Sequence, residues 1–158
     1  TYFYIRALMC VIEISKILKK DSSRLQERAE RIKKAFLEKY FDEKSGAFFG
    51  SVEAADAFGF DLGLGNEKTL ENIVEKYEKL GEFDTGIFGT YVLIKTLCEN
   101  GEKELAKKLL TSKGENSFYN MMKHGATTLW ENWDGCDSRN HPMFGAVTEF
   151  IVKYFNEA

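Results

Sequence analysis

The chain has 158 residues, which fits one folded domain, and it carries 22 lysines and arginines against 25 aspartates and glutamates, for a formal net charge of −3. This near balance argues against a nucleic acid or an anionic membrane surface as a partner, because both attract a concentrated basic face. No apolar run approaches the roughly 18 residues that a membrane-spanning helix needs.

The chain opens on Thr1 rather than on methionine. We therefore interpret it as a piece excised from a longer protein, and the lack of a secretion signal excludes no compartment. Its three cysteines, Cys10, Cys98 and Cys136, are odd in number and lack the spacing of metal or redox motifs. Cys10 and Cys98 fall in apolar helical patterns and are predicted to be small core residues. We predict no metal and no cofactor, and favour a reducing compartment such as the cytoplasm.

Helical periodicity dominates, with apolar residues recurring at i, i+3, i+4 and i+7 in most segments. We predict helices over residues 2–19, 24–40, 52–64, 67–80, 90–99, 102–110, 117–123 and 142–156. Ser23 with Gln26 predicts a capping box at the start of the second helix. Asn66 is predicted to cap the fourth helix and Gly81 to end it.

The pattern predicts an all-α fold, since it shows no strand signal and no constant repeat period. Less polar segments such as 52–64 alternate imperfectly with charged ones such as 24–40 and 67–80. An inner and an outer layer of helices would produce this alternation. Three loops of unusual composition, 41–51, 81–90 and 124–141, tend to precede the less polar helices. They would gather at one rim, where functional sites are commonly built.

The third of these loops contains both tryptophans of the chain, Trp130 and Trp133, with Glu131 between them. Flat aromatic faces beside an acid suit a carbohydrate, because the rings stack on the C–H faces of a sugar and the carboxylate handles protons or hydroxyls. The alternative is that the two rings fill a core while Glu131 lies on the surface. The local chemistry leaves both interpretations open.

His141 closes the same loop and precedes the one proline of the chain, Pro142. Proline favours the first helical position, so His141 is predicted to cap the last helix. The positive end of the helix dipole favours a neutral imidazole, which can both donate to and accept from a sugar hydroxyl. The alternative is that His141 only caps the helix.

Four motifs, in this order and spacing, resemble those of the bacterial α-L-rhamnosidases of glycoside hydrolase family 78. They read Asp84-Thr85-Gly86-Ile87-Phe88-Gly89-Thr90, Glu99-Asn100-Gly101, Gly125-Ala126-Thr127-Thr128-Leu129-Trp130-Glu131-Asn132-Trp133-Asp134-Gly135 and Ser138-Arg139-Asn140-His141-Pro142-Met143-Phe144-Gly145. The likeness covers nearly the whole chain, because residues 2–64 resemble the helical hairpins that precede these motifs in the family. It implies a partial (α/α)6 toroid, with the sugar pocket at one end of the ring of hairpins.

The resemblance also implies roles for individual residues. The glutamate of the family's Trp-Glu-x-Trp motif is the general base of an inverting hydrolysis, and Glu131 corresponds to it. The histidine of the Ser-x-Asn-His motif contacts rhamnose and corresponds to His141. Trp130 and Trp133 would wall the pocket, and Asp84 would lie near it, with a structural role equally open. The implied ligand is a glycoside or oligosaccharide with a terminal α-L-rhamnosyl group.

Two departures from the family pattern bear on activity. Ser117-Phe118-Tyr119 stands where the family usually has a tryptophan, so one aromatic wall differs. The family's general acid lies in an Arg-Asp-Glu-Arg type motif followed by Gly-Trp, and Asp42-Glu43 lacks that context. We therefore interpret residues 1–158 as one helical domain, the C-terminal portion of a six-hairpin barrel cut at both ends, without the family's C-terminal β-sandwich and inactive on its own.

A partial ring leaves the flanks of its terminal helices bare, so we expect a partner, either the remainder of the same polypeptide or a second copy of the chain. Two other functions stay open. One is a free-standing helical module that binds a sugar or a protein without catalysis. The other is a different (α/α)6 hydrolase or isomerase that reuses the Trp-Glu-x-Trp loop.

Overall fold

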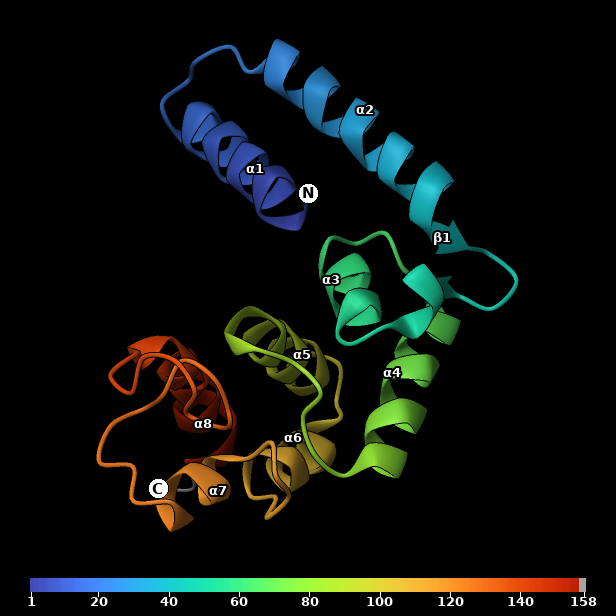
Figure 1. The fold of residues 1–158 in the computed structure, drawn as a ribbon. Helices are drawn as coiled ribbons and strands as arrows, with labels where there is room; N and C mark the ends of the chain where they lie inside the picture. Colours follow the sequence, from blue (N-terminus) through green and yellow to red (C-terminus); the bar gives the residue numbers. More distant parts are fainter. Residues whose placement is uncertain (157–158) are drawn as a thin grey trace.

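The computed structural model describes residues 1–156, and it is mainly helical (Figure 1). The α-helices are α1 (Tyr2–Ile17), α2 (Ser23–Tyr40), α3 (Ala55–Asp61), α4 (Glu67–Leu80), α5 (Ile87–Glu99), α6 (Lys103–Leu110), α7 (Phe118–Lys123) and α8 (Thr148–Phe155). Two short strands, β1 (Phe41–Asp42) and β2 (Ala47–Phe48), and two 3₁₀ turns, η1 (Phe49–Ser51) and η2 (Pro142–Val147), complete the described elements. The predicted all-α class is confirmed.

The predicted caps of α4 are confirmed, whereas that of α2 is displaced by one residue. The Asn66 side chain accepts the backbone N–H of Thr69 at 3.2 Å, and Gly81 ends the helix in the left-handed region with φ of 72°. At α2 the N-cap residue is Ser22 and no capping box forms: the Ser22 side chain caps no backbone N–H, and its hydroxyl accepts the side-chain amide of Gln26 at 2.8 Å. Ser23 is the first residue of the helix rather than its cap, and its N–H and hydroxyl donate to the carboxylate of Asp21.

Three helices differ most from the prediction. α5 begins at Ile87 rather than at 90, because Gly86 serves as its N-cap. α3 covers seven residues rather than 52–64, because Ser51 and Glu53 adopt positive φ angles that interrupt a helix. The last helix is split into η2 and α8, and His141 precedes it as predicted.

Within residues 1–156, a small antiparallel ladder is the one departure from an all-helical chain. It pairs Phe41 with Phe48 and Asp42 with Ala47. The turn between the strands forms because the Asp42 carboxylate accepts the N–H of Lys44 at 3.1 Å, and Gly46 adopts a φ of 72°. Strands of two residues carry no alternation of apolar and polar positions, so the sequence pattern could not show them.

The predicted inner and outer layers are present. Figure 1 shows α1, α3, α5 and α8 following one another along an arc, with α2, α4 and α6 outside it. α5 contacts α3 on one side and η2 and α8 on the other, and each outer helix contacts the inner helix that precedes it in the chain. α5 buries eight of its 13 residues, whereas the outer helix α2 buries Ala29 alone.

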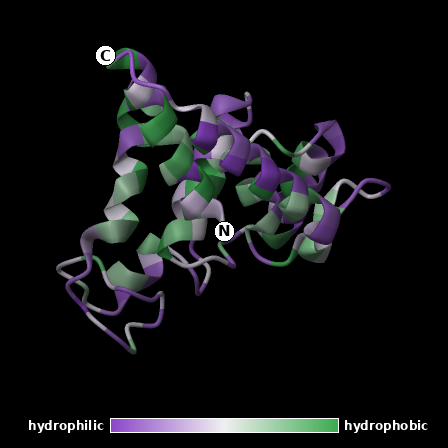
Figure 2. Cartoon of the chain, turned by 90° about the horizontal axis from the view of Figure 1, so that it is seen from above, coloured by the Kyte–Doolittle hydropathy of each residue, from purple (hydrophilic) through white to green (hydrophobic). Residues whose placement is uncertain are grey.

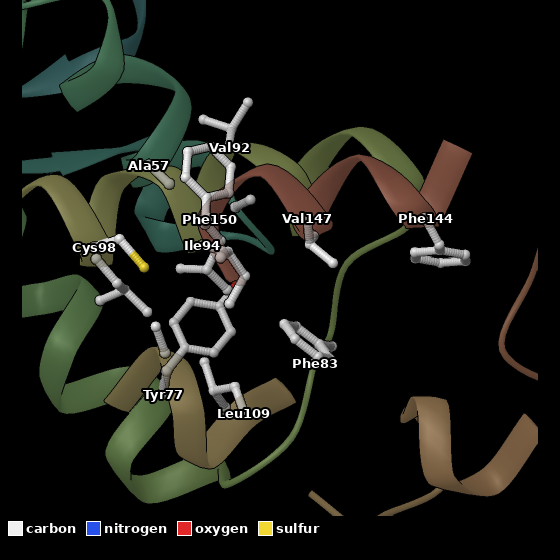
Figure 3. Close-up of a cluster of buried hydrophobic side chains, with 14 of the residues drawn as sticks. Ala57, Tyr77, Phe83, Val92, Ile94, Cys98, Leu109, Phe144, Val147 and Phe150 are labelled. Atoms are coloured by element: carbon white, nitrogen blue, oxygen red, sulfur yellow. The ribbon is translucent and has the colours of Figure 1, made fainter. Parts of the chain in front are cut away.

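The main core surrounds α5 and draws side chains from segments far apart in the sequence. Figure 3 shows Tyr77, Phe83, Phe144 and Phe150 converging beside the buried residues of α5. A smaller core lies between α1 and α2 and contains Leu8, Ile12 and Ala29. Of the two cysteines predicted to be core residues, Cys98 is buried and Cys10 is exposed, because Cys10 lies on the side of α1 that no other helix covers.

One face of α1 is apolar and exposed. Figure 2, which colours the chain by hydropathy, shows apolar and polar residues interspersed along the helices. The exposed apolar residues of this helix and its C-cap are Phe3, Tyr4, Val11, Ile14, Ile17 and Leu18. α8 likewise exposes Ile151 and Val152. Within residues 1–156, none of the helices combines the length and the apolar character needed to cross a membrane.

We expect the isolated chain to associate through the exposed face of α1, because contiguous apolar patches above about 300–600 Å² are rare on soluble monomers. Static light scattering over a concentration series should give an average mass that rises with concentration. Ile14→Glu, which places a charge in this face, should hold the chain closer to a monomer, and Leu80→Glu on α4 is the matched control. A wild-type chain that stays monomeric throughout the series would contradict the expectation.

Two leucines test where the core lies, because they differ mainly in burial. Leu97 in α5 is 0% exposed and Leu80 in α4 is 42% exposed. Leu97→Ala should lower the free energy of unfolding by about 2–5 kcal/mol, the usual cost of a cavity in a core. Leu80→Ala should change it by about 0.5 kcal/mol or less. Urea-induced unfolding followed by circular dichroism measures both, and similar losses would contradict this assignment of the core.

Candidate functional site

Residues 125–141, here called the Trp loop, fold back on themselves. The backbone N–H of Glu131 donates to the carbonyl of Ser138 at 2.7 Å, and the N–H of His141 donates to the carbonyl of Leu129 at 2.8 Å. The hydroxyl of Thr128 adds a bond to the Arg139 carbonyl. These bonds align the two arms of the loop side by side, so they bring Glu131 and His141 to neighbouring positions.

The side chains of Glu131 and His141 face each other across this pairing. Oε2 of Glu131 lies 3.7 Å from Nδ1 of His141, and the two side chains are 40% and 28% exposed. The backbone N–H of Ser138 lies 3.4 Å from the same carboxylate oxygen. His141 is the N-cap residue of η2, yet its side chain makes no capping hydrogen bond. Its imidazole is therefore free to interact with Glu131 or with a ligand.

Both tryptophans are buried, at 4% exposed for Trp130 and 8% for Trp133. Trp133 stacks on Phe83 with the ring centroids 5.3 Å apart, and it also contacts Phe144. Its indole N–H donates to the carbonyl of Thr85 at 2.7 Å. Trp133 is thus part of the main core, which is the alternative that the local sequence left open, and its remaining surface lines a depression next to Asp84.

The tip of the Trp loop is shaped by a tight turn against Trp130. Gly135 adopts a φ of 68°, and a Cβ built there would lie 2.6 Å from the Trp130 ring, so only glycine fits. The Arg139 guanidinium lies 5.0 Å from the centre of that ring. Hydrogen bonds from the thiol and the backbone N–H of Cys136 hold the pKa of Asp134 below its usual value. Asp134 is therefore ionised at neutral pH.

Asp84 lies near the Trp loop, but its carboxylate is already engaged. One oxygen accepts the hydroxyl of Tyr77 at 2.6 Å, and the other pairs with the ammonium of Lys76, also at 2.6 Å. Burial, followed by the hydrogen bond to Asp84, raises the pKa of Tyr77 well above its usual value. Tyr77 therefore remains a hydrogen-bond donor, and Asp84 helps to hold α4 against the segment that precedes α5.

Two neighbouring depressions lie between the Trp loop and the start of α5. The first, of about 350 Å³, is lined by Glu53, Ala54, Phe58, Thr85, Gly86, Ile87, Phe88, Gly89, Glu131 and Asn132. The second, of about 340 Å³, is lined by Asp84, Thr85, Gly86, Asn116, Asn132, Trp133, Asp134, Cys136 and Phe144. They share Thr85, Gly86 and Asn132, and each has the size of a small-ligand site. His141 contacts Glu131 but lines neither depression.

The structure thus places Glu131 in one depression and Asp84 with Trp133 in the next, whereas the buried Trp130 lines neither of them and instead borders a separate depression next to α7. Sequence reasoning missed Glu53 and Asn132. Glu53 was predicted to lie in a helix, and its positive φ of 44° has no simple sequence signal. Within residues 1–156, no group of three histidine, cysteine, aspartate or glutamate side chains is placed to hold a metal ion.

Comparison with known proteins decides the family. The family described as the bacterial alpha-L-rhamnosidase 6 hairpin glycosidase domain matches residues 1–155. The chain belongs to this family. It is 25% identical to an alpha-L-rhamnosidase of Formosa agariphila over 97% of this chain and 18% of that protein. The chain therefore spans less than a fifth of that relative.

Solved structures of alpha-L-rhamnosidases share the fold. The structure from Dictyoglumus thermophilum is 29% identical, with a TM-score of 0.82 over 96% of this chain and 19% of that one. The Streptomyces avermitilis enzyme, solved with L-rhamnose, has a TM-score of 0.85 at 24% identity over 95% of this chain and 16% of that one. The arc of inner and outer helices therefore belongs to a six-hairpin glycosidase fold.

The indole hydrogen bond of Trp133 provides a test of how the loop is held in this six-hairpin domain. Trp133→Phe and Trp130→Phe remove the same ring atoms, but only the first removes the bond to Thr85. Trp133→Phe should therefore lower the free energy of unfolding by about 1–3 kcal/mol more, because it removes the shorter of the two buried hydrogen bonds to the Thr85 carbonyl and leaves only that from the Thr90 hydroxyl at 3.4 Å. Urea unfolding of the two variants measures the difference. Equal losses would mean that the bond does not hold the loop.

Proposed function

We propose that this chain is the C-terminal portion of the six-hairpin catalytic domain of an α-L-rhamnosidase-like glycoside hydrolase, and that it binds a terminal α-L-rhamnosyl group. The observation that carries the proposal is the open depression in which Glu131, held beside His141, faces the start of α5. Relatives named alpha-L-rhamnosidase match nearly the whole chain, which supports the same ligand. The partner is thus a rhamnose-containing oligosaccharide or glycoside.

Glu131 acts as the general base of an inverting hydrolysis in this proposal. Its carboxylate accepts a proton from a water molecule while the water oxygen attacks the anomeric carbon from the face opposite the glycosidic bond. That bond breaks as the new carbon–oxygen bond forms, and the leaving oxygen takes a proton from an acid. His141 lies 3.7 Å from Glu131, where it can orient the carboxylate and contact a sugar hydroxyl.

In this proposal, the general acid of the reaction is not supplied by this chain. An inverting site needs a second carboxyl group, roughly 6.5–9.5 Å from the base, that enters the reaction protonated. Asp84 accepts the Tyr77 hydroxyl on one oxygen and pairs with Lys76 through the other, and Asp134 has a lowered pKa, so we assign neither as the proton donor. We therefore propose that the acid comes from the remainder of the same polypeptide or from a second copy, and that this chain alone does not cleave natural rhamnosides.

Glu131→Gln provides the test, because glutamine keeps the shape of the side chain but cannot take a proton from water. Calorimetry with L-rhamnose should give an affinity within a few-fold of wild type. Slow hydrolysis of an aryl rhamnoside, whose leaving group departs without an acid, should fall by about 10²–10⁴. Glu43→Gln, an exposed glutamate in the β1–β2 turn, is the matched control and should change neither quantity.

The outcomes separate the alternatives. A wild-type chain that does not bind L-rhamnose would refute the sugar site. Binding with equal turnover in wild type and Glu131→Gln would remove Glu131 from the mechanism and favour a sugar-binding module without catalysis. Hydrolysis of a natural disaccharide by the pure chain would show that a second carboxyl group is already present in it.

A further inference from the structure

The segment from Phe49 to Glu53 has an unusual backbone. Phe49, Ser51 and Glu53 have φ angles of 51°, 59° and 44°, and Gly50 between them has 66°. Among residues 1–156, Lys19 is the one other residue with a side chain in this left-handed region. Such conformations cost free energy in residues that carry a Cβ and persist where the surroundings enforce them. A run of them therefore needs something that holds it.

Lys76 and Tyr77 of α4 hold the segment. The ammonium of Lys76 donates to the carbonyl of Ser51 at 3.0 Å and to that of Glu53 at 2.7 Å, and it pairs with Asp84. The hydroxyl of Tyr77 lies between Asp84 and the same Glu53 carbonyl, which is 3.3 Å away. We call these contacts the Lys76 clamp. By holding the backbone at Glu53, the clamp fixes the direction in which the Glu53 side chain projects.

The result is a second carboxylate on the wall of the Glu131 depression. Glu53 lines this depression together with Phe58, Phe88 and Glu131, which come from three other segments. Within residues 1–156, no hydrogen bond or ion pair engages the Glu53 carboxylate. Asp56, which follows in α3, is by contrast buried and accepts the backbone N–H of Phe48. Glu53 is thus the available acceptor on its side of the depression.

We propose that Glu53 binds the substrate and accepts hydrogen bonds from sugar hydroxyls, while Glu131 handles the water. The proposal rests on the proposed function. A carboxylate has two oxygens that can accept from neighbouring hydroxyls at once, and hydrogen bonds to a charged acceptor are the strong ones. Phe58 and Phe88 supply apolar surface for the C–H face of the same ring. The strained backbone of the segment is thus tolerated because it directs the Glu53 carboxylate into the depression.

Two variants of Glu53 separate binding from folding. Glu53→Gln should weaken the binding of methyl α-L-rhamnoside by about ten- to a hundredfold, since it replaces a charged acceptor without changing its size. Glu53→Gly should weaken binding similarly, yet raise the thermal midpoint by about 2–4 °C, because glycine adopts this φ without strain. A residue with a purely structural role would not lose binding while it gains stability. Glu43→Gln again serves as the control.

A set of monodeoxy rhamnosides locates the contact. The sugar that lacks the hydroxyl bound by Glu53 should bind wild type weakly and lose little more in Glu53→Gln. Unchanged affinity in Glu53→Gln, with wild-type binding intact, would overturn this inference and leave the proposed function standing. Lost hydrolysis with full affinity would overturn it too, because it would make Glu53 a proton donor. A wild-type chain that does not bind the rhamnoside would defeat the proposed function, and this inference with it.

Discussion

The hydrogen bond from the Trp133 indole to the Thr85 carbonyl is the contact on which the candidate site depends. The internal bonds of the Trp loop fix its shape, but they do not fix where the loop lies. Trp133 does so, because its ring also stacks on Phe83 and packs at a tilt against Phe144 in the main core. Glu131 is thereby held opposite the first turn of α5. The depression exists because one loop is anchored to the start of one buried helix.

The sequence predicted the helical layers well, because they follow from the periodicity of apolar residues. α5 reads as apolar nearly throughout and lies inside, while α2 reads as charged and lies outside. Caps with local chemistry, such as Asn66 and Gly81, were predicted for the same reason. The sequence did not predict three other features: the two-residue strands, the early start of α5 and the split last helix. These features depend on single hydrogen bonds or glycine conformations rather than on a repeated pattern.

The site could be predicted only in part, because distant contacts decide what its residues do. The motifs assigned Glu131 and His141 to one site, but the backbone hydrogen bonds that bring the two residues to neighbouring positions are seen only in the structure. The role of Trp133 could not be decided locally, since its partner Phe83 lies in another segment. The place of Glu53 in the site could not be predicted, for the same reason. Its conformation depends on Lys76, which a one-dimensional pattern does not connect to it.

Two adjacent residues, Asp84 and Thr85, connect both walls of the depression. Asp84 pairs with Lys76, which holds the Glu53 side, and the Thr85 carbonyl receives Trp133, which holds the Glu131 side. The separation of the two carboxylates is therefore set through one short stretch of backbone. Asp84 thus contributes through its contacts: it pairs with the lysine that holds the Glu53 side of the depression that Glu53 and Glu131 both line.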